Sequence, residues 1–139
     1  MPSFADVAAL ALELPGTEEG VRYGHRTWQV GGKVYAWERP FSKADIKRFG
    51  STAPPSGPVL AVSVADLGEK EAVLAAGDDA FFTIPHFDGY AAVLVELDRV
   101  GTDALREALE EAWACVAPAE AVAAHLRTHR ASGGGGASA

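Results

Sequence analysis

The sequence predicts an α+β fold, a two-layer sandwich in which an antiparallel sheet carries helices on one face. Two pairs of β-prone segments are joined by short turn-forming connections, which favours antiparallel pairing. The candidate strands alternate apolar and polar side chains, so one face of the sheet can meet water. Helical segments with apolar stripes flank the strands and can cover the other face.

The first helix is expected over residues 4–14. Ser3 stands at its N-cap and Asp6 stands three residues later, which is the spacing of a capping box. Apolar side chains recur inside this segment at helical spacing, so one side of the helix is expected to be buried. A polar segment at 17–25 follows, to which no helix or strand is assigned.

A hairpin is the clearest local feature of the chain. β-prone residues occupy 27–30 and 33–39, and the two runs are separated by Gly31 and Gly32. Glycine tolerates the positive φ angles of a type I′ or II′ turn, so this two-residue loop predicts a tight hairpin.

The later elements follow from similar signals, with Thr102 expected to cap the best helix and Pro118 expected to open the last one. In order, we expect a short basic helix at 42–49, a loop at 51–58, a strand at 59–64, a helix at 67–76, strands at 81–84 and 92–97, and helices at 103–116 and 118–130.

Size and composition favour one domain over residues 1–131 and a flexible Gly/Ser/Ala tail at 132–139. The single cysteine, Cys115, cannot form an internal disulfide and is expected to be a buried small residue. No apolar run approaches the roughly 20 residues of a bilayer span, and residues 1–14 carry no lysine or arginine. We expect a cytoplasmic monomer without a membrane partner.

The hairpin aromatics bear on function because of where their rings point. Alternation places Tyr35 and Trp37 on one face of their strand, away from Val34 and Ala36. Trp28 lies on the partner strand. Since helices cover one face only, we expect one aromatic set to be buried and the other to line a partly exposed groove.

The net charge of −7 argues against general affinity for polyanions, because such binding depends on neutralised phosphates. Residues 22–48 nevertheless hold seven basic side chains against two acidic ones, a local charge of +5. Either these charges form one polyanion-binding face, or they mix with later acids in the fold. The seven are Arg22, Arg26, Lys33, Arg39, Lys43, Lys47 and Arg48.

A second candidate site is a pocket for a small anion at one rim of the sheet. Its expected residues lie in turn-like segments or in the hairpin, and they are Tyr23, His25, Trp37, His86 and Tyr90. Imidazole titrates near neutral pH, which suits anion binding. The histidines can instead hydrogen-bond loop carbonyls and hold turns. His125 and His129 are expected at a solvated helix end.

Several segments together resemble the MmcQ/YjbR-like family over about residues 4–126. They are LPGTEE at 14–19, YGH at 23–25, WQVGGKV at 28–34, FTIPHFDGY at 82–90, VLVEL at 93–97 and LEEAW at 109–113. The resemblance implies a frataxin-like (CyaY-like) fold. Members are often labelled DNA-binding, from a proposed double-wing arrangement of hairpins. The long basic stretch at 40–58 departs from the short turn typical of the family.

We therefore expect a non-catalytic DNA-binding protein that uses a basic hairpin surface. The alternative is a domain that binds a small anionic ligand or a protein partner near His25 and His86. No nucleophile with an adjacent base is recognisable, and we expect no enzyme activity, no metal and no cofactor. An enzyme remains a third class that the residues alone do not support.

Overall fold

The computed structural model describes residues 2–50 and 57–127, and it shows the expected α+β fold. Six antiparallel strands form one open sheet in the order β1-β2-β3-β4-β6-β5. The strands are β1 (Thr17–Arg22), β2 (His25–Val30), β3 (Lys33–Glu38), β4 (Val59–Ser63), β5 (Phe81–Phe82) and β6 (Ala92–Glu96). The helices are α1 (Phe4–Leu12), α2 (Lys43–Arg48), α3 (Leu67–Ala75), the 3-10 turn η1 (Pro85–Phe87) and α4 (Thr102–Val116). Most of the expected 51–58 loop and the 132–139 tail lie outside the described residues.

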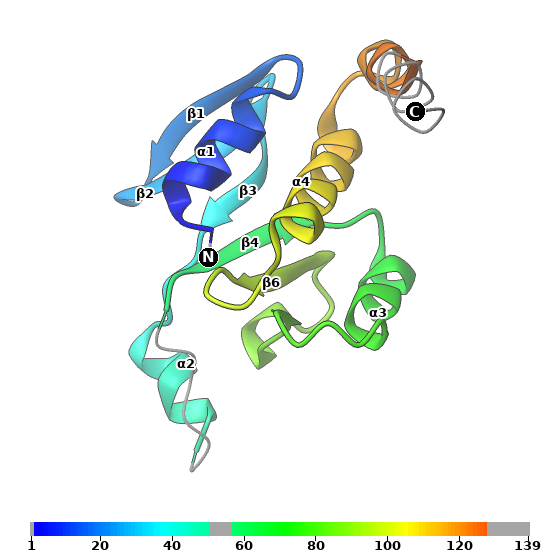
Figure 1. Ribbon diagram of the computed structural model, residues 1–139. Helices are drawn as coiled ribbons and strands as arrows, with labels where there is room; N and C mark the ends of the chain where they lie inside the picture. Colours follow the sequence, from blue (N-terminus) through cyan, green and yellow to red (C-terminus); the bar gives the residue numbers. More distant parts are fainter. Residues whose placement is uncertain (1, 51–56, 128–139) are drawn as a thin grey trace.

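Helices α1 and α4 lie against one face of the sheet, which we call the closed face (Figure 1). The main core between them contains the α4 stripe of Leu105, Leu109 and Trp113, all at most 1% exposed. On β6, Val93 and Val95 point into the same core, as their alternation predicts. Among the described residues, every helix is too short or too polar to cross a bilayer.

Strand β1 lies in the polar segment at 17–25, to which the sequence pattern assigns no helix or strand. It pairs with β2 along its whole length, from Thr17 opposite Val30 to Arg22 opposite His25. β1 lies at the edge of the sheet and none of its residues is fully buried. A solvated edge strand needs no apolar alternation, and charged side chains protect its free edge from pairing with other chains. Its sequence therefore lacks the usual strand signal.

A β-bulge corrects the expectation that Tyr35 and Trp37 share one face. Trp28 pairs with Ala36, but the next residue of β2 pairs with Val34, so Tyr35 is an extra residue in β3. Tyr35 and Ala36 are both buried in the main core, whereas Trp37 packs against the second cluster on the other face. The expected split between buried and groove-lining aromatics exists, but it places Tyr35 with the buried Trp28 and leaves Trp37 on the other face.

The other face, which we call the open face, is only partly wet. Over β4 and β6 it carries a second apolar cluster that includes Ala61, Leu94 and Phe87. Phe41 and Phe49, which lie just before and just after α2, pack onto this cluster. The exposed part of the open face therefore lies over β1, β2 and β3, where the sheet meets the segment that follows β3.

Two details of α4 also differ from expectation. The helix starts at Thr102, and Gly101 is its N-cap without a side-chain hydrogen bond. Cys115 is exposed, because it lies outside the buried stripe, and its Sγ contacts the carbonyl oxygen of Glu111 at 3.3 Å. Partial burial and the negative charge of Glu111 raise the pKa of the Cys115 thiol, which disfavours the nucleophilic thiolate.

A last helical segment over residues 119–127 follows Pro118, as expected up to the end of the described residues. His125 does not stand free in water as expected. Its Nε2 lies 3.2 Å from a carboxylate oxygen of Glu110, and its ring meets the Trp113 ring edge-on at 5.0 Å between centroids. These contacts attach the segment to α4. His129 lies outside the described residues.

Candidate functional site

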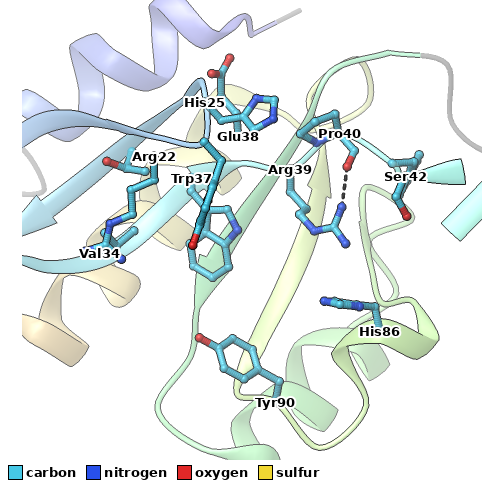
Figure 2. A pocket seen from close by; sticks show the side chains of 13 residues that line it. Arg22, His25, Val34, Trp37, Glu38, Arg39, Pro40, Ser42, His86 and Tyr90 are labelled. Atoms are coloured by element: carbon cyan, nitrogen blue, oxygen red, sulfur yellow. Dashed lines mark hydrogen bonds between the residues drawn. The ribbon is translucent and has the colours of Figure 1, made fainter. Parts of the chain in front are cut away.

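A pocket of about 720 Å³ opens over the exposed part of the open face. All five residues of the expected anion pocket line it, together with Arg22, Arg39 and other residues of β1, β2 and β3. Figure 2 shows Trp37 on the inner wall, Arg22 to one side of it and Arg39 to the other, with His86 and Tyr90 facing them. We call this cavity the Trp37 pocket.

The aromatic rings of the pocket are held from below by the second apolar cluster. Phe87 is buried, and its ring centroid lies 6.4 Å from that of Trp37 and 5.8 Å from that of Tyr90. Tyr90 itself is 55% exposed, so its ring is supported on one side and open on the other. Supported rings with one free face are the arrangement that stacks on a flat ligand.

Two turns with nearly the same backbone flank β2, and only one obeys the usual residue preference. Gly31 and Gly32 have φ angles of 56° and 81°, and Tyr23 and Gly24 have φ angles of 53° and 79°. Glycine or asparagine suits such positions, whereas an aromatic residue at positive φ is strained. Tyr23 is also 98% exposed. The β1–β2 hairpin imposes this positive φ, because the two strands pair up to Arg22 opposite His25, and the exposed Tyr23 lines the Trp37 pocket.

Lys70 fixes the far wall of the pocket and was missed in the sequence. Lys70 is only 6% exposed, and its Nζ donates hydrogen bonds to the carbonyl oxygens of Phe87 at 2.6 Å and Tyr90 at 2.9 Å. The ammonium group thus ties α3 to the loop that carries His86 and Tyr90. A lysine in a short amphipathic helix normally faces water, so no sequence signal distinguishes this one.

Arg39 and Asp45 hold the segment between β3 and α2. Their side chains form an ion pair at 3.0 Å, with 17% and 2% of the side chain exposed. Ser42 caps α2, and its hydroxyl accepts from the Asp45 backbone N–H. Burial alone would raise the pKa of Asp45, but hydrogen bonds from Ser42 and the Arg39 charge outweigh burial and lower this pKa. Asp45 is therefore ionised near neutral pH.

The seven basic residues predicted to bind nucleic acid do not form one hairpin surface. Arg26 pairs with Glu19 at 3.0 Å and lies over the buried Trp28 ring, on the face away from the pocket. Arg39 is held by Asp45, and Lys33 stands beside the Gly31–Gly32 turn. Arg22 reaches the pocket mouth. The remaining three, on the exposed side of α2, are Lys43, Lys47 and Arg48.

The described part of the chain brings no group of three metal-ligating side chains together. The pocket residues that sequence reasoning missed are Thr27, Val34, Glu38, Pro40, Phe41 and Ser42. Most of these missed residues lie next to predicted ones in β2, in β3 or in the segment after β3. The bulge in β3 determines which side chains of that strand face the cavity.

Comparison with known proteins gives a family, several relatives and a similar fold. The YjbR family model matches residues 12–115. Uncharacterised proteins of Mycobacterium bovis and Mycobacterium tuberculosis are 43% identical over 129 residues, covering 91% of this chain and 97% of theirs. The crystal structure of Deinococcus radiodurans protein DR2400, with a DUF419 domain, has a TM-score of 0.58 at 21% identity. That alignment covers 81% of this chain and 77% of the other, and it supports the fold alone.

Proposed function

This chain belongs to the YjbR family, and from that premise we propose that it is a non-catalytic binding protein whose Trp37 pocket accepts a nucleotide. The ligand chemistry is a flat ring joined to an anionic phosphate. Such a unit is supplied either by a free nucleotide or by a single strand of DNA. The observation that carries the proposal is the set of exposed rings and cationic side chains at one pocket mouth.

The rings give the pocket its preference for flat ligands. Trp37, Tyr90 and Tyr23 all line the cavity, and a base stacked on such a ring gains roughly 1–3 kcal/mol. The strained, solvent-exposed Tyr23 supports this view, because local rules tend to be broken where function requires it. The volume of about 720 Å³ also lies in the range of ligand pockets, about 300–1,000 Å³.

The charges give the pocket its preference for anions. Arg22 is exposed at the mouth and has no ion pair among the described residues, while His25 and His86 contribute further N–H donors. Arginine presents a planar fork of donors that matches a phosphate group. Glu38 is the acid of the lining, and one of its carboxylate oxygens accepts from the backbone N–H of Arg26.

A strand of DNA is favoured as a source by the charges beyond the pocket. Ser42 lines the cavity, and α2 begins at the next residue with Lys43, Lys47 and Arg48 exposed. A polyanion whose base sits in the pocket can continue over these three cations. A free nucleotide would not reach them, so the α2 charges separate the two sources.

Binding without chemistry is proposed because neither aliphatic hydroxyl of the lining is paired with a general base: Thr27 Oγ1 has no hydrogen-bond partner among the described residues, and the Ser42 hydroxyl caps α2. Ser42 Oγ accepts the backbone N–H of Asp45 and serves as a helix cap, 3.1 Å from that nitrogen. A nucleophilic serine would need a general base to take its proton. The neighbouring Asp45 carboxylate is committed to Arg39 and to the Ser42 backbone N–H.

Isothermal titration calorimetry with AMP, CMP, GMP and UMP tests the proposal. Ribose 5-phosphate carries the charge without the ring, and the nucleosides carry the ring without the charge, so both should bind more weakly. A short single-stranded oligothymidylate and the matching duplex test the second source. If DNA is the ligand, the single strand should bind more tightly than any mononucleotide, with a strong dependence on salt. Absence of binding by every nucleotide and strand would refute the proposal.

Two matched variants locate the binding site. Arg22→Ala and Lys33→Ala each remove one exposed positive charge beside a turn of β2, but only Arg22 lines the pocket. We expect Arg22→Ala to weaken nucleotide binding several-fold and Lys33→Ala to leave it unchanged. Equal effects would indicate a diffuse electrostatic attraction instead of a defined site.

A further inference from the structure

Thr27 is the buried polar residue that the fold leaves unsatisfied. It is 3% exposed, lies on β2, and lines the Trp37 pocket. Its hydroxyl oxygen is buried and has no hydrogen-bond partner among the described residues. Leaving a buried hydroxyl without a partner costs free energy, because the group gives up its bonds to water. The side chain therefore needs an explanation beyond strand packing.

The other buried polar residues of the described chain, Asp45 and Lys70, have hydrogen-bond partners. Asp45 receives hydrogen bonds from Ser42 and Arg39, and Lys70 donates to two carbonyl oxygens of the neighbouring loop. Valine has the same shape as threonine and also favours strands, so valine would fill the Thr27 position without the unsatisfied group. The hydroxyl stands out as the one polar group that packing does not require.

Gly20 on the neighbouring strand lies beside this hydroxyl and beside the Gln29 side chain. It pairs directly with Thr27, and a Cβ atom placed on Gly20 would lie only 3.1 Å from the Thr27 Oγ1 and 3.4 Å from the Gln29 Oε1. Its φ angle is not among the positive ones, so the backbone does not demand glycine there. A glycine inside a strand weakens the strand and often marks a place where a ligand approaches closely.

Trp37 is the direct partner of Thr27 on the other side, across β2 and β3. Residues paired in this way point to the same face, so the Trp37 and Thr27 side chains both lie on the pocket face. A flat ring that stacks on Trp37 turns one of its edges toward β2. A hydroxyl can donate or accept, so it can bind either kind of polar group on that edge.

We propose that Thr27 is the specificity-determining residue of the pocket, whose hydroxyl hydrogen-bonds the polar edge of the bound base. The inference rests on the proposed function and goes beyond it, because it concerns which rings are accepted. A ring with nitrogen or oxygen on its edge satisfies the hydroxyl. A hydrocarbon ring of similar size leaves the hydroxyl as it is in the free protein, so it gains no hydrogen bond and binds less tightly.

The test measures the binding of two probes to three proteins, namely wild type, Thr27→Val and Thr27→Ser. One probe is the mononucleotide that binds wild type most tightly, and the other is phenyl phosphate, which has a flat ring and a charge but no polar ring edge. We expect Thr27→Val to weaken nucleotide binding about five- to tenfold, the loss of one hydrogen bond. Binding of phenyl phosphate should stay the same. Thr27→Ser keeps the hydroxyl and should keep the preference for the nucleotide.

The melting temperature without ligand supplies an independent readout. Thr27→Val removes an unsatisfied polar group, so its melting temperature should equal or exceed that of wild type. A lower melting temperature would overturn the inference, because it would show that the hydroxyl already has a stabilising partner. An equal change in the binding of both probes, or in neither, would also overturn it. If wild type bound neither the mononucleotide nor phenyl phosphate, the Trp37 pocket itself would be refuted as a binding site. That result is distinct from a failure of the Thr27 inference.

Discussion

The closed and open faces of the hairpin treat their polar and aromatic groups in opposite ways. On the closed face, Trp28 and Tyr35 are 0% exposed, and each has a hydrogen-bond partner for its polar atom. On the open face, Trp37 is half-buried beside a pocket and the Thr27 hydroxyl is unsatisfied. The closed face is arranged for stability, and the open face keeps groups available at a cost in stability.

The largest test of this difference exchanges one tryptophan on each face for alanine. Trp28→Ala should lower the free energy of unfolding by about 3–5 kcal/mol, because it empties the centre of the main core. Trp37→Ala should cost less than half as much and should abolish stacking, weakening nucleotide binding about 5- to 150-fold. Urea denaturation and calorimetry measure the two effects. Equal losses of stability would contradict the contrast between the faces.

Tyr35 makes the closed face sensitive to alkaline pH. Burial raises the pKa of its hydroxyl from 10.0 to about 12, although the hydrogen bond with Thr17 at 3.0 Å lowers it somewhat. As pH rises, the unfolded chain loses the Tyr35 proton before the folded chain does. The contribution of the buried Tyr35 hydroxyl to the free energy of unfolding is therefore complete below pH 10 and is lost as pH rises towards 12. The loss should amount to roughly 2–3 kcal/mol.

Tyr35→Phe is the control for this titration. It removes the ionisable group and should flatten the fall in stability over that pH range. It should also cost about 1 kcal/mol at neutral pH, because the Thr17 hydroxyl loses its partner. Denaturation curves at several pH values give both numbers. An unchanged alkaline slope in the variant would show that another group is responsible.

Asp45→Asn tests the border of the open face, where Arg39 and the start of α2 depend on a single carboxylate. We expect a loss of about 1–2 kcal/mol at neutral pH, since a charged hydrogen bond and part of a helix cap are removed. The pKa of Asp45 is lowered in the folded chain, so its contribution is present above the usual carboxylate pKa. That contribution disappears as pH falls through the folded value. In a series of denaturation curves at different pH, the asparagine variant should lack the loss of stability at acidic pH that Asp45 causes. A loss of equal size in the variant would show that another group is responsible.

The smallest effect is expected at the two turns of β2. Tyr23→Asn should raise the free energy of unfolding by about 0.3–1 kcal/mol, because asparagine accepts positive φ more readily. The same variant should bind nucleotide less tightly, since a pocket ring is lost. Gly31→Asn, at nearly the same φ, should change neither quantity noticeably. Loss of stability in Tyr23→Asn would show that the exposed ring has a structural role.

Much of the local structure was readable from the sequence because its causes are local. Ser3 with Asp6 forms the expected capping box of α1, and α2 lies within the expected helix at 42–49. Gly31 and Gly32 adopt the positive φ angles that the hairpin requires. The pocket residues His25, His86 and Tyr90 could be grouped because they lie in turn-like segments, which concentrate at the rim of a sheet.

The tertiary structure alone decided β1, the bulge at Tyr35 and the burial of Lys70 and Thr27. An edge strand is formed by pairing with its neighbour, and its own residues need show no pattern. One extra residue in β3 reverses which side chains face the pocket, and alternation within a single strand cannot reveal this. The unsatisfied hydroxyl of Thr27 is likewise defined only by what surrounds it. The sequence determined elements stabilised by near neighbours, whereas partners distant in sequence determined which side chains the pocket presents.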